Sequence, residues 1–381
     1  MSKRRVVGVR QLVAGLAAVS LSCLGTAAAG ATTAPHATVT TVVSGLDNPR
    51  DLDFGAGGRL YVAEAGHGGT HCLPAGPEGP TCLGFTSEIS KINISHHVAR
   101  PIVSGLVSGA APDGSFATGV DGISARGRHI YGIITAAPDA VPDTAFTASF
   151  RSRVKAQLGR LIRASTDGSW TSIASVGHRD FVWSAHHANL VPEFPDANPY
   201  GVITLKHGRS YVVDAGSNTL DWVGRDGRVR VLAFIPNPPA SDAVPTCIDR
   251  GRHGALYIGE LTGGGNVPGA ASVWRYAPRS GRLTRWATGL TAVTGCGFGP
   301  DGRFYATEFS TRGLDNAAPA TGAVVRVRPH GTVPITVVSG LNFPGGFAAR
   351  GDSLYVSNWS IAPASNNGGP TGEVVRIDLG S

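Results

Sequence analysis

Hydrophobic residues in this chain come in short runs separated by turns rich in glycine, proline and aspartate. Runs such as 323–327 and 373–377 approximate the two-residue period of a half-buried β-strand. The stretches between the runs hold turn-forming residues at close intervals. The pattern therefore predicts an all-β protein built from many short antiparallel strands.

One unit of this pattern recurs along the chain. A short apolar strand and a tight turn precede a strand centred on tyrosine, and a third and a fourth strand follow. The tyrosines that mark six copies are Tyr61, Tyr131, Tyr211, Tyr257, Tyr305 and Tyr355. Several fourth strands end in a Ser/Thr-Gly-Leu signature, at Leu46, Leu106, Leu290 and Leu341. Four antiparallel strands in each of six repeats predict a six-bladed β-propeller.

The two ends of the chain predict how the ring closes. The last repeat stops after its third strand, near Asp378, while residues 38–46 form a spare fourth strand before the first repeat. We expect this N-terminal strand to complete the last blade, so that first and last blades are joined by hydrogen bonds and no sheet edge is left open.

The repeat frame also sorts the loops onto two faces. Turns from first to second and from third to fourth strands are short, as at 55–58 and 299–302. All long segments fall among the second-to-third and blade-to-blade connections, including 65–87, 135–157 and 177–199. Because binding groups usually sit on long loops held by a rigid scaffold, we expect function on this long-loop face.

Composition and charge exclude several classes of protein. The 381 residues include 53 glycines and 25 prolines, too many turn formers for a helical bundle or a coiled coil. The formal charge is +7, but Lys3, Arg4, Arg5 and Arg10 lie near the N-terminus and no basic cluster follows along the sequence, so we expect no nucleic-acid partner.

Residues 1–31 have the basic start, apolar centre and small terminal residues of a secretory signal peptide. No later segment is long and apolar enough for a membrane span. We therefore expect residues 32–381 to form one exported, monomeric propeller domain, extracellular or periplasmic.

Four cysteines remain after the signal segment, and an exported protein favours disulfides. Cys72 and Cys82 bracket a loop rich in glycine and proline, and we predict that they are bonded. Cys247 and Cys296 occupy positions one residue out of phase in neighbouring repeats, which would aim them at opposite faces of their strands. The sequence allows either a second disulfide between these two cysteines or two buried free thiols.

The starts of the six innermost strands should meet where the channel opens on the long-loop face. The predicted binding residues there are Asn48, Arg50, Asp121, Asn198, Tyr200, Thr246 and Asn342. Oxygen donors from Asp51, Asp121 and Asn198 would suit Ca²⁺, the one cofactor that the sequence suggests. Ordinary turn chemistry is the alternative interpretation of the same residues.

Candidate catalytic groups are few. The residue three positions after each repeat tyrosine is polar in five repeats, and Glu260 and Glu308 form the most interesting pair. Their recurrence favours a structural role, namely capping the second-to-third turn by accepting backbone N–H bonds. His186, in the segment 177–199, is a candidate base or ligand. The chain has no Gly-x-Ser-x-Gly, His-Glu-x-x-His or phosphate-loop motif.

The chain from about residue 40 onward resembles the ScyD/ScyE family of exported bacterial proteins and, more widely, NHL-type six-bladed propellers. The matching stretches include 44–50, 61–66, the Cys72 to Cys82 loop, 198–201, 212–218 and 257–263. It departs from the usual family pattern at Gly295-Cys296, where relatives more often carry an acidic residue. The resemblance implies an exported propeller without an assigned activity.

Two functional hypotheses follow from these observations. The first is a protein that binds a small molecule, a glycan or a protein on its long-loop face. The second is a Ca²⁺-assisted hydrolase or lactonase with its site at the central channel. The sequence leaves open whether the protein is an enzyme.

Overall fold

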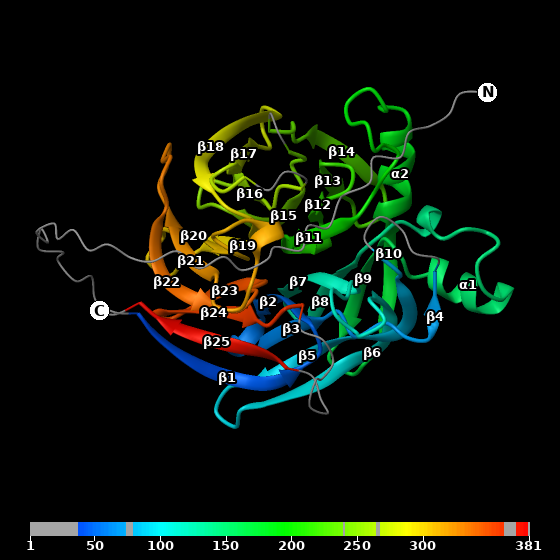
Figure 1. The fold of residues 1–381 in the computed structure, drawn as a ribbon, viewed down its shortest axis with the longest axis horizontal. Helices are drawn as coiled ribbons and strands as arrows, with labels where there is room; N and C mark the ends of the chain where they lie inside the picture. The colour runs from blue at the N-terminus through cyan, green and yellow to red at the C-terminus, as the bar shows by residue number, and fades with distance from the viewer. Residues whose placement is uncertain (1–36, 74–78, 239–240, 264–266, 362–370, 380–381) are drawn as a thin grey trace, which may run out of the picture.

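The computed structural model describes residues 37–73, 79–238, 241–263, 267–361 and 371–379. Its strands form six antiparallel sheets arranged as the blades of a propeller (Figure 1). The predicted all-β, six-bladed architecture is confirmed. The predicted signal segment 1–31 lies outside the described residues.

Each of the first three blades reads outward from its innermost strand. Blade 1 contains β2 (Pro49–Phe54), β3 (Leu60–Glu64), β5 (Cys82–Asn93) and β6 (Val98–Ala110). Blade 2 contains β7 (Val120–Arg126), β8 (His129–Ile134), β9 (Arg160–Ser165) and β10 (Trp170–Ser175). Blade 3 contains β11 (Pro199–Thr204), β12 (Ser210–Asp214), β13 (Thr219–Val223) and β14 (Val229–Phe234).

The remaining three blades repeat the arrangement. Blade 4 contains β15 (Pro245–Arg250), β16 (Leu256–Glu260), β17 (Ala271–Ala277) and β18 (Arg282–Leu290). Blade 5 contains β19 (Val293–Phe298), β20 (Phe304–Glu308), β21 (Gly322–Val327) and β22 (Ile335–Leu341). Blade 6 contains β23 (Phe347–Arg350), β24 (Ser353–Asn358), β25 (Gly372–Asp378) and β1 (Thr38–Leu46).

Blade 6 joins the two ends of the chain, as predicted. β1 pairs antiparallel with β25, with Thr38 opposite Asp378 and Leu46 opposite Gly372. Figure 1 shows the blue N-terminal strand beside the red C-terminal one. Val42, Val43 and Leu46 of β1 are buried. The ring is therefore closed by hydrogen bonds and by apolar packing.

Blade 1 departs from the four-stranded pattern. A two-residue strand, β4 (His71–Cys72), pairs with the start of β5 and widens this sheet to five strands. The Cys72–Cys82 disulfide lies within this pairing, which confirms the predicted bond. The disulfide holds the residues on both sides of the loop as an extension of the blade.

The tyrosine that marks each repeat has a packing role. In blade 4, Tyr257 of the second strand lies over Gly251 in the first-to-second turn, and a Cβ at Gly251 would come within 2.7 Å of its ring. Gly55 with Tyr61, and Gly299 with Tyr305, repeat the contact. A glycine and an aromatic ring thus close the same end of three blades, which explains part of the recurring pattern.

The two described α-helices lie in long connections. α1 (Ala148–Lys155) and the short 3-10 helix η2 (Pro138–Ala140) lie between β8 and β9, and α2 (Val176–Ala185) lies between β10 and β11. The other 3-10 helices are η1 (Ala56–Gly58), η3 (Lys206–Gly208) and η4 (Leu314–Asn316). The sequence pattern predicted 135–157 and 177–199 as long segments but not as helical. No described helix has the length and apolar character of a membrane span.

Candidate functional site

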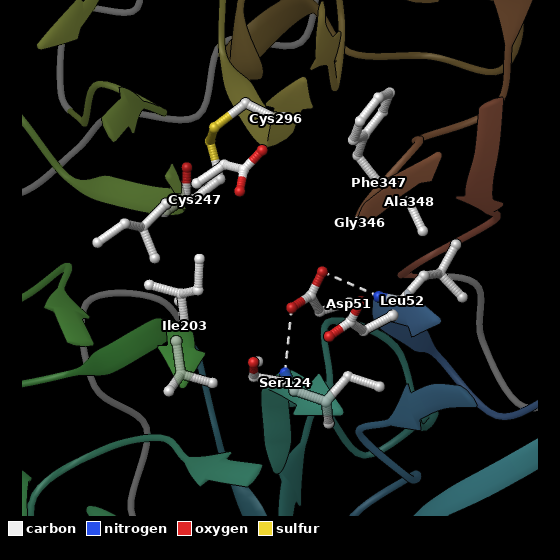
Figure 2. Close-up of a pocket in the computed structure, with 18 of the residues that line it drawn as sticks. Asp51, Leu52, Ser124, Ile203, Cys247, Cys296, Gly346, Phe347 and Ala348 are labelled. Carbon is white, nitrogen blue, oxygen red and sulfur yellow. Dashed lines mark hydrogen bonds between the residues drawn. A yellow bond between two sulfur atoms is a disulfide. The ribbon is translucent and has the colours of Figure 1, made fainter. Parts of the chain in front are cut away.

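A cavity of about 220 Å³ runs along the propeller axis, and the innermost strand of every blade contributes to its lining. These strands surround the centre of the ring in Figure 1. Figure 2 shows the cavity open between them, with the side chain of Asp51 pointing inward. The predicted convergence of β2, β7, β11, β15, β19 and β23 is therefore present and encloses a small channel.

Three aspartates in the channel join neighbouring blades. Asp51 Oδ1 accepts the N–H of Leu52 at 2.9 Å and Oδ2 accepts the N–H of Ile123, in the next blade, at 3.0 Å (Figure 2). Asp53 accepts from Phe54 and Ala125, each at 2.7 Å. Both oxygens of each carboxyl group are thus engaged between blades 1 and 2.

Asp249 repeats this arrangement between blades 4 and 5. Its carboxyl group accepts the N–H groups of Arg250 at 2.6 Å and Phe298 at 2.8 Å. Burial raises the pKa of Asp51 to about 8 and that of Asp53 to about 7, and it also raises the pKa of Asp249. Because their oxygens are already used, these three groups position the blades.

A charged cluster lies at the long-loop end of the channel, at the starts of β2, β7 and β11. The Arg50 guanidinium lies 3.8 Å from Asp121 Oδ1 and interacts electrostatically with the phenol of Tyr200. Burial raises the pKa of Tyr200 to about 12, so its hydroxyl stays protonated at neutral pH. Arg50, Asp121 and Tyr200 were all predicted binding residues, and the fold brings them together.

This cluster retains unused hydrogen-bonding capacity. Asp121 Oδ1 accepts the N–H of Gly119 at 3.1 Å, whereas Asp121 Oδ2 has no hydrogen-bond partner among the described residues. Arg50 donates from Nη2 to the carbonyl of Ala117, but its Nε is unpartnered in the same part of the chain. A buried carboxylate oxygen and a buried guanidinium N–H without partners are costly, and together they match a ligand with an adjacent donor and acceptor.

The other predicted binding residues mostly tie loops together. Asn48 donates to the carbonyls of Gly66 and Gly114, at 2.9 and 3.0 Å. The side-chain oxygens of Asn198 and Asn342 accept N–H groups from the loops that contain Ala136 and Ala320. Thr246 does line the channel, and its hydroxyl donates to the carbonyl of Val293 at 2.7 Å, joining blades 4 and 5.

The residues proposed for Ca²⁺ do not line the channel as a set. Asp51 and Asp121 are part of its lining, but Asn198 is not, and its side-chain oxygen is used by the N–H of Ala136. Asp51 has both oxygens engaged, so Asp121 Oδ2 is the free carboxylate oxygen of the three residues. In the described ranges, no group of three or more His, Cys, Asp or Glu side chains is arranged to hold a metal ion.

Glu260 and Glu308 lie buried at the ends of their strands and accept hydrogen bonds from the protein. Glu260 accepts the N–H of Ser272 at 2.8 Å and the indole N–H of Trp274. Glu308 accepts the N–H of Thr291 at 2.9 Å. Burial raises the pKa of each glutamate to about 7. Neither residue lines the channel.

The recurring polar residue three positions after the repeat tyrosine was expected to cap the second-to-third turn, but most copies bond elsewhere. Three of these residues accept a backbone N–H group from the segment that leads into the first strand of the same blade. The pairs are Glu64 with Asp47, Glu308 with Thr291, and Asn358 with Asn342. Asp214 bonds both to this entry, at Asn198 N–H, and to the second-to-third turn, at Gly216 and Ser217. The acceptors therefore fasten the entry into the blade more often than the turn.

His186 lies at the end of α2, outside the channel lining. Its Nδ1 is 2.7 Å from the carbonyl of Val182 in the same helix, and its ring is exposed. Its neighbour His187 stacks on Trp183, with ring centroids 4.1 Å apart. Within the described residues, no carboxylate forms an ion pair with His186, so the structure provides no orienting group for a general base.

A second carboxyl cluster joins α2 to blade 3. Asp180, Asp214 and Asp221 are fully buried and interact with one another. Burial first, and then the neighbouring carboxylates, raises the pKa of Asp180, and the pKa of Asp221 rises to about 8. Both oxygens of Asp180 lack a conventional hydrogen-bond donor among the described residues. The group therefore shares protons at neutral pH and holds the helix against its blade.

Sequence reasoning missed Asp53, Asp249 and the contact between Asp180 and Asp221. The strand period contained a signal for the first two, because Asp53 lies two residues after Asp51 and so shares its face. The Asp180 contact depends on how α2 folds back onto blade 3, which no local pattern encodes.

Comparison with known proteins supports the fold. No family model and no curated protein matches the chain. Solved structures that match include a Bacteroides thetaiotaomicron protein of unknown function, with 10% identity, a TM-score of 0.50, and coverage of 89% of this chain and 75% of that one. A streptogramin B lyase matches with 12% identity, a TM-score of 0.47, and coverage of 90% of this chain and 98% of that one. A luciferin-regenerating enzyme matches with 11% identity, a TM-score of 0.48, and coverage of 90% of this chain and 95% of that one. The similarity to the Bacteroides thetaiotaomicron protein supports the fold, and at 10% identity it extends to the fold alone.

The disulfides bear on the compartment. Both cysteine pairs are bonded, Cys72 to Cys82 and Cys247 to Cys296. Disulfides persist in oxidising compartments and are rare in the cytosol. The two bonds therefore fit an extracellular protein.

Proposed function

We propose that this protein is an exported binding propeller of the ScyD/ScyE type that takes a small polar molecule into the long-loop end of its central channel. The observation that carries the proposal is the cluster of the buried Arg50 and Asp121 with the half-buried Tyr200, which lines the cavity and keeps Asp121 Oδ2 and Arg50 Nε without partners in the described chain. In this proposal, Asp121 accepts from the ligand, and Arg50 and Tyr200 donate to it.

The cavity volume and the lining support a small ligand. Sites for drug-sized molecules enclose roughly 300–1,000 Å³, and the channel encloses about 220 Å³. A small molecule with neighbouring hydroxyl groups, such as a monosaccharide, fits that size and satisfies both unpartnered atoms. A polymer or a folded protein would have to bind outside the channel.

The experiment is a thermal-shift screen of the purified protein against neutral monosaccharides, sugar acids and small lactones. We expect at least one compound to raise the melting temperature of the native protein. Asp121→Asn should abolish that shift, because the amide presents N–H groups where the ligand donates. Asp352→Asn is the matched control, since Asp352 is exposed and is not part of the channel lining.

The screen also addresses the alternative hypothesis. A lactone that is hydrolysed in a Ca²⁺-dependent way, measured as acid release, would favour the hydrolase over the binding protein. If no compound in any class shifts the melting temperature, or if Asp121→Asn leaves the shift unchanged, the channel proposal is wrong.

A further inference from the structure

A second concave site lies on the opposite face of the propeller, between blades 2 and 3. It is a groove of about 790 Å³, bounded by the β7–β8, β11–β12 and β13–β14 turns and by parts of β9 and β10. These are short turns between first and second or third and fourth strands, so the groove faces away from the long loops. It shares no lining residue with the channel.

The groove is strongly basic. Arg126, Arg163, Lys206 and Arg225 line it, and all four are exposed. Within the described ranges, none of these four cations forms an ion pair with a carboxylate. The lining has one carboxylate, Asp226, which already pairs with Arg228 at 3.3 Å.

His129 and His207 also line the groove and add hydrogen-bond donors to it. Nδ1 of His129 is buried and has no partner in the described part of the chain. Positive charges that outnumber the nearby carboxylates repel one another, so this arrangement does not favour the stability of the fold. It is the arrangement expected of a site that gains its negative charge from a ligand.

The surrounding face strengthens the field. Each of the six connections between a first and a second strand has an arginine or a lysine in the turn or at the strand end beside it, at Arg59, Arg126, Lys206, Arg252, Arg303 and Arg350. A concave site lined mainly by charges of one sign attracts counter-ions from within about a Debye length, ~8–10 Å at physiological salt. The groove is therefore the recessed part of a basic face.

We propose that this groove binds an anionic polysaccharide whose sugars carry phosphate or sulfate esters. Arginine presents a planar fork of N–H donors that matches such oxyanions bidentately, and Arg126, Arg163 and Arg225 supply three forks around one groove. The groove is open at the surface and larger than the channel, so a chain can lie along it. This site is independent of the function proposed for the channel.

The lining favours a polysaccharide over a single-stranded nucleic acid. Proteins that bind single strands stack bases on exposed aromatic rings, and Tyr131, the one non-histidine aromatic residue in the lining, is buried. Saccharide esters need cations and hydrogen-bond donors, which the groove has. The basic residues of the groove are far apart in the sequence, from Arg126 to Arg225, and the fold brings them together.

The test measures binding of the full mature chain to sulfated dextran, phosphorylated dextran and neutral dextran at low salt. We expect binding to one or both anionic dextrans, weakening as salt rises, and none to neutral dextran. The two anionic arms distinguish sulfate from phosphate esters. Arg163→Gln together with Arg225→Gln should weaken binding about tenfold, because the two substitutions remove two of the three guanidinium groups that contact the esters.

The matched control is Arg279→Gln together with Arg282→Gln, which removes the same charge from exposed positions beside the β17–β18 turn on the same face. It should change the affinity less than twofold, and both double variants should keep the native melting temperature. Equal weakening in the two variants would assign binding to the whole face and overturn the groove. Absence of binding to both anionic dextrans, or tighter binding of oligo-dT than of either dextran, would also overturn the proposal.

Discussion

Cys247 and Cys296 form a disulfide between the innermost strands of neighbouring blades, with their Cα atoms 5.7 Å apart. Cys247 lies opposite Gly259 in blade 4, and Cys296 lies opposite Ala306 in blade 5. A Cβ at Gly259 would come within 2.6 Å of the Cys247 sulfur, so glycine leaves the space that the bond occupies. The disulfide links two blades at the channel wall.

We predict that Cys247→Ser with Cys296→Ser destabilises the protein more than Cys72→Ser with Cys82→Ser. The first bond spans 49 residues and the second spans 10. Restriction of the unfolded chain by loops of these lengths is worth about 4 and about 3 kcal/mol, respectively. Urea unfolding of the two double variants measures the difference. Equal unfolding midpoints would contradict the prediction.

This disulfide also shows where sequence reasoning reached its limit. The two cysteines are one residue out of phase, and strand alternation does aim them at opposite faces of their own blades. In a propeller, however, each blade packs one face of its sheet against the opposite face of the next blade. Side chains that meet between two blades therefore come from opposite faces of the repeat. The phase difference that argued against the bond is what the geometry between blades requires.

We predict that a chain beginning at residue 47 fails to fold, whereas one beginning at residue 37 folds normally. The shorter chain lacks β1, whose buried Val42, Val43 and Leu46 complete blade 6 and whose backbone pairs with β25. Without it, the last blade loses its outer strand and leaves β25 as an exposed edge. Soluble yield and a cooperative thermal transition measure the result. A soluble, cooperatively melting shorter chain would contradict the closure.

The repeat allowed the blades and their closure to be predicted because each copy restates the same local pattern. Tyr257 over Gly251 is one such local contact, readable as a spacing within the sequence. The channel cluster was partly predictable, because Arg50, Asp121 and Tyr200 are each the second residue of an innermost strand. The basic groove was not, because Arg126, Arg163 and Arg225 come from separate strands and turns that meet only in the folded ring.

We predict that Asp180→Asn stabilises the protein at pH 8 by about 1–3 kcal/mol and changes little at pH 4. Folded Asp180 and Asp221 have pKa values above the usual value near 4, with Asp221 at about 8, so the folded state keeps protons that the unfolded chain releases. The stability they contribute is fully present below about pH 4 and is lost as the pH rises to about 8. An amide at position 180 removes one charge and supplies donors to Asp214 and Asp221.

Urea unfolding at pH 4 and pH 8 measures this effect, with Asp352→Asn as the control. Asp352 is exposed, so its substitution should leave the pH dependence unchanged. If native protein and Asp180→Asn lose stability equally between the two pH values, the three carboxyl groups do not share protons as inferred.

We predict that Ca²⁺ leaves the melting temperature of the EDTA-treated protein unchanged. Ca²⁺ prefers six to eight oxygen ligands, and Asp121 Oδ2 is the free carboxylate oxygen among the residues first considered for it. A site saturated 100-fold above its Kd would add about 2.7 kcal/mol, which raises the melting temperature of a domain this large by roughly 4 °C. Melting curves with excess Ca²⁺ and with EDTA measure the difference. A rise of that size, lost in Asp121→Asn, would contradict this prediction and favour the Ca²⁺-assisted hydrolase.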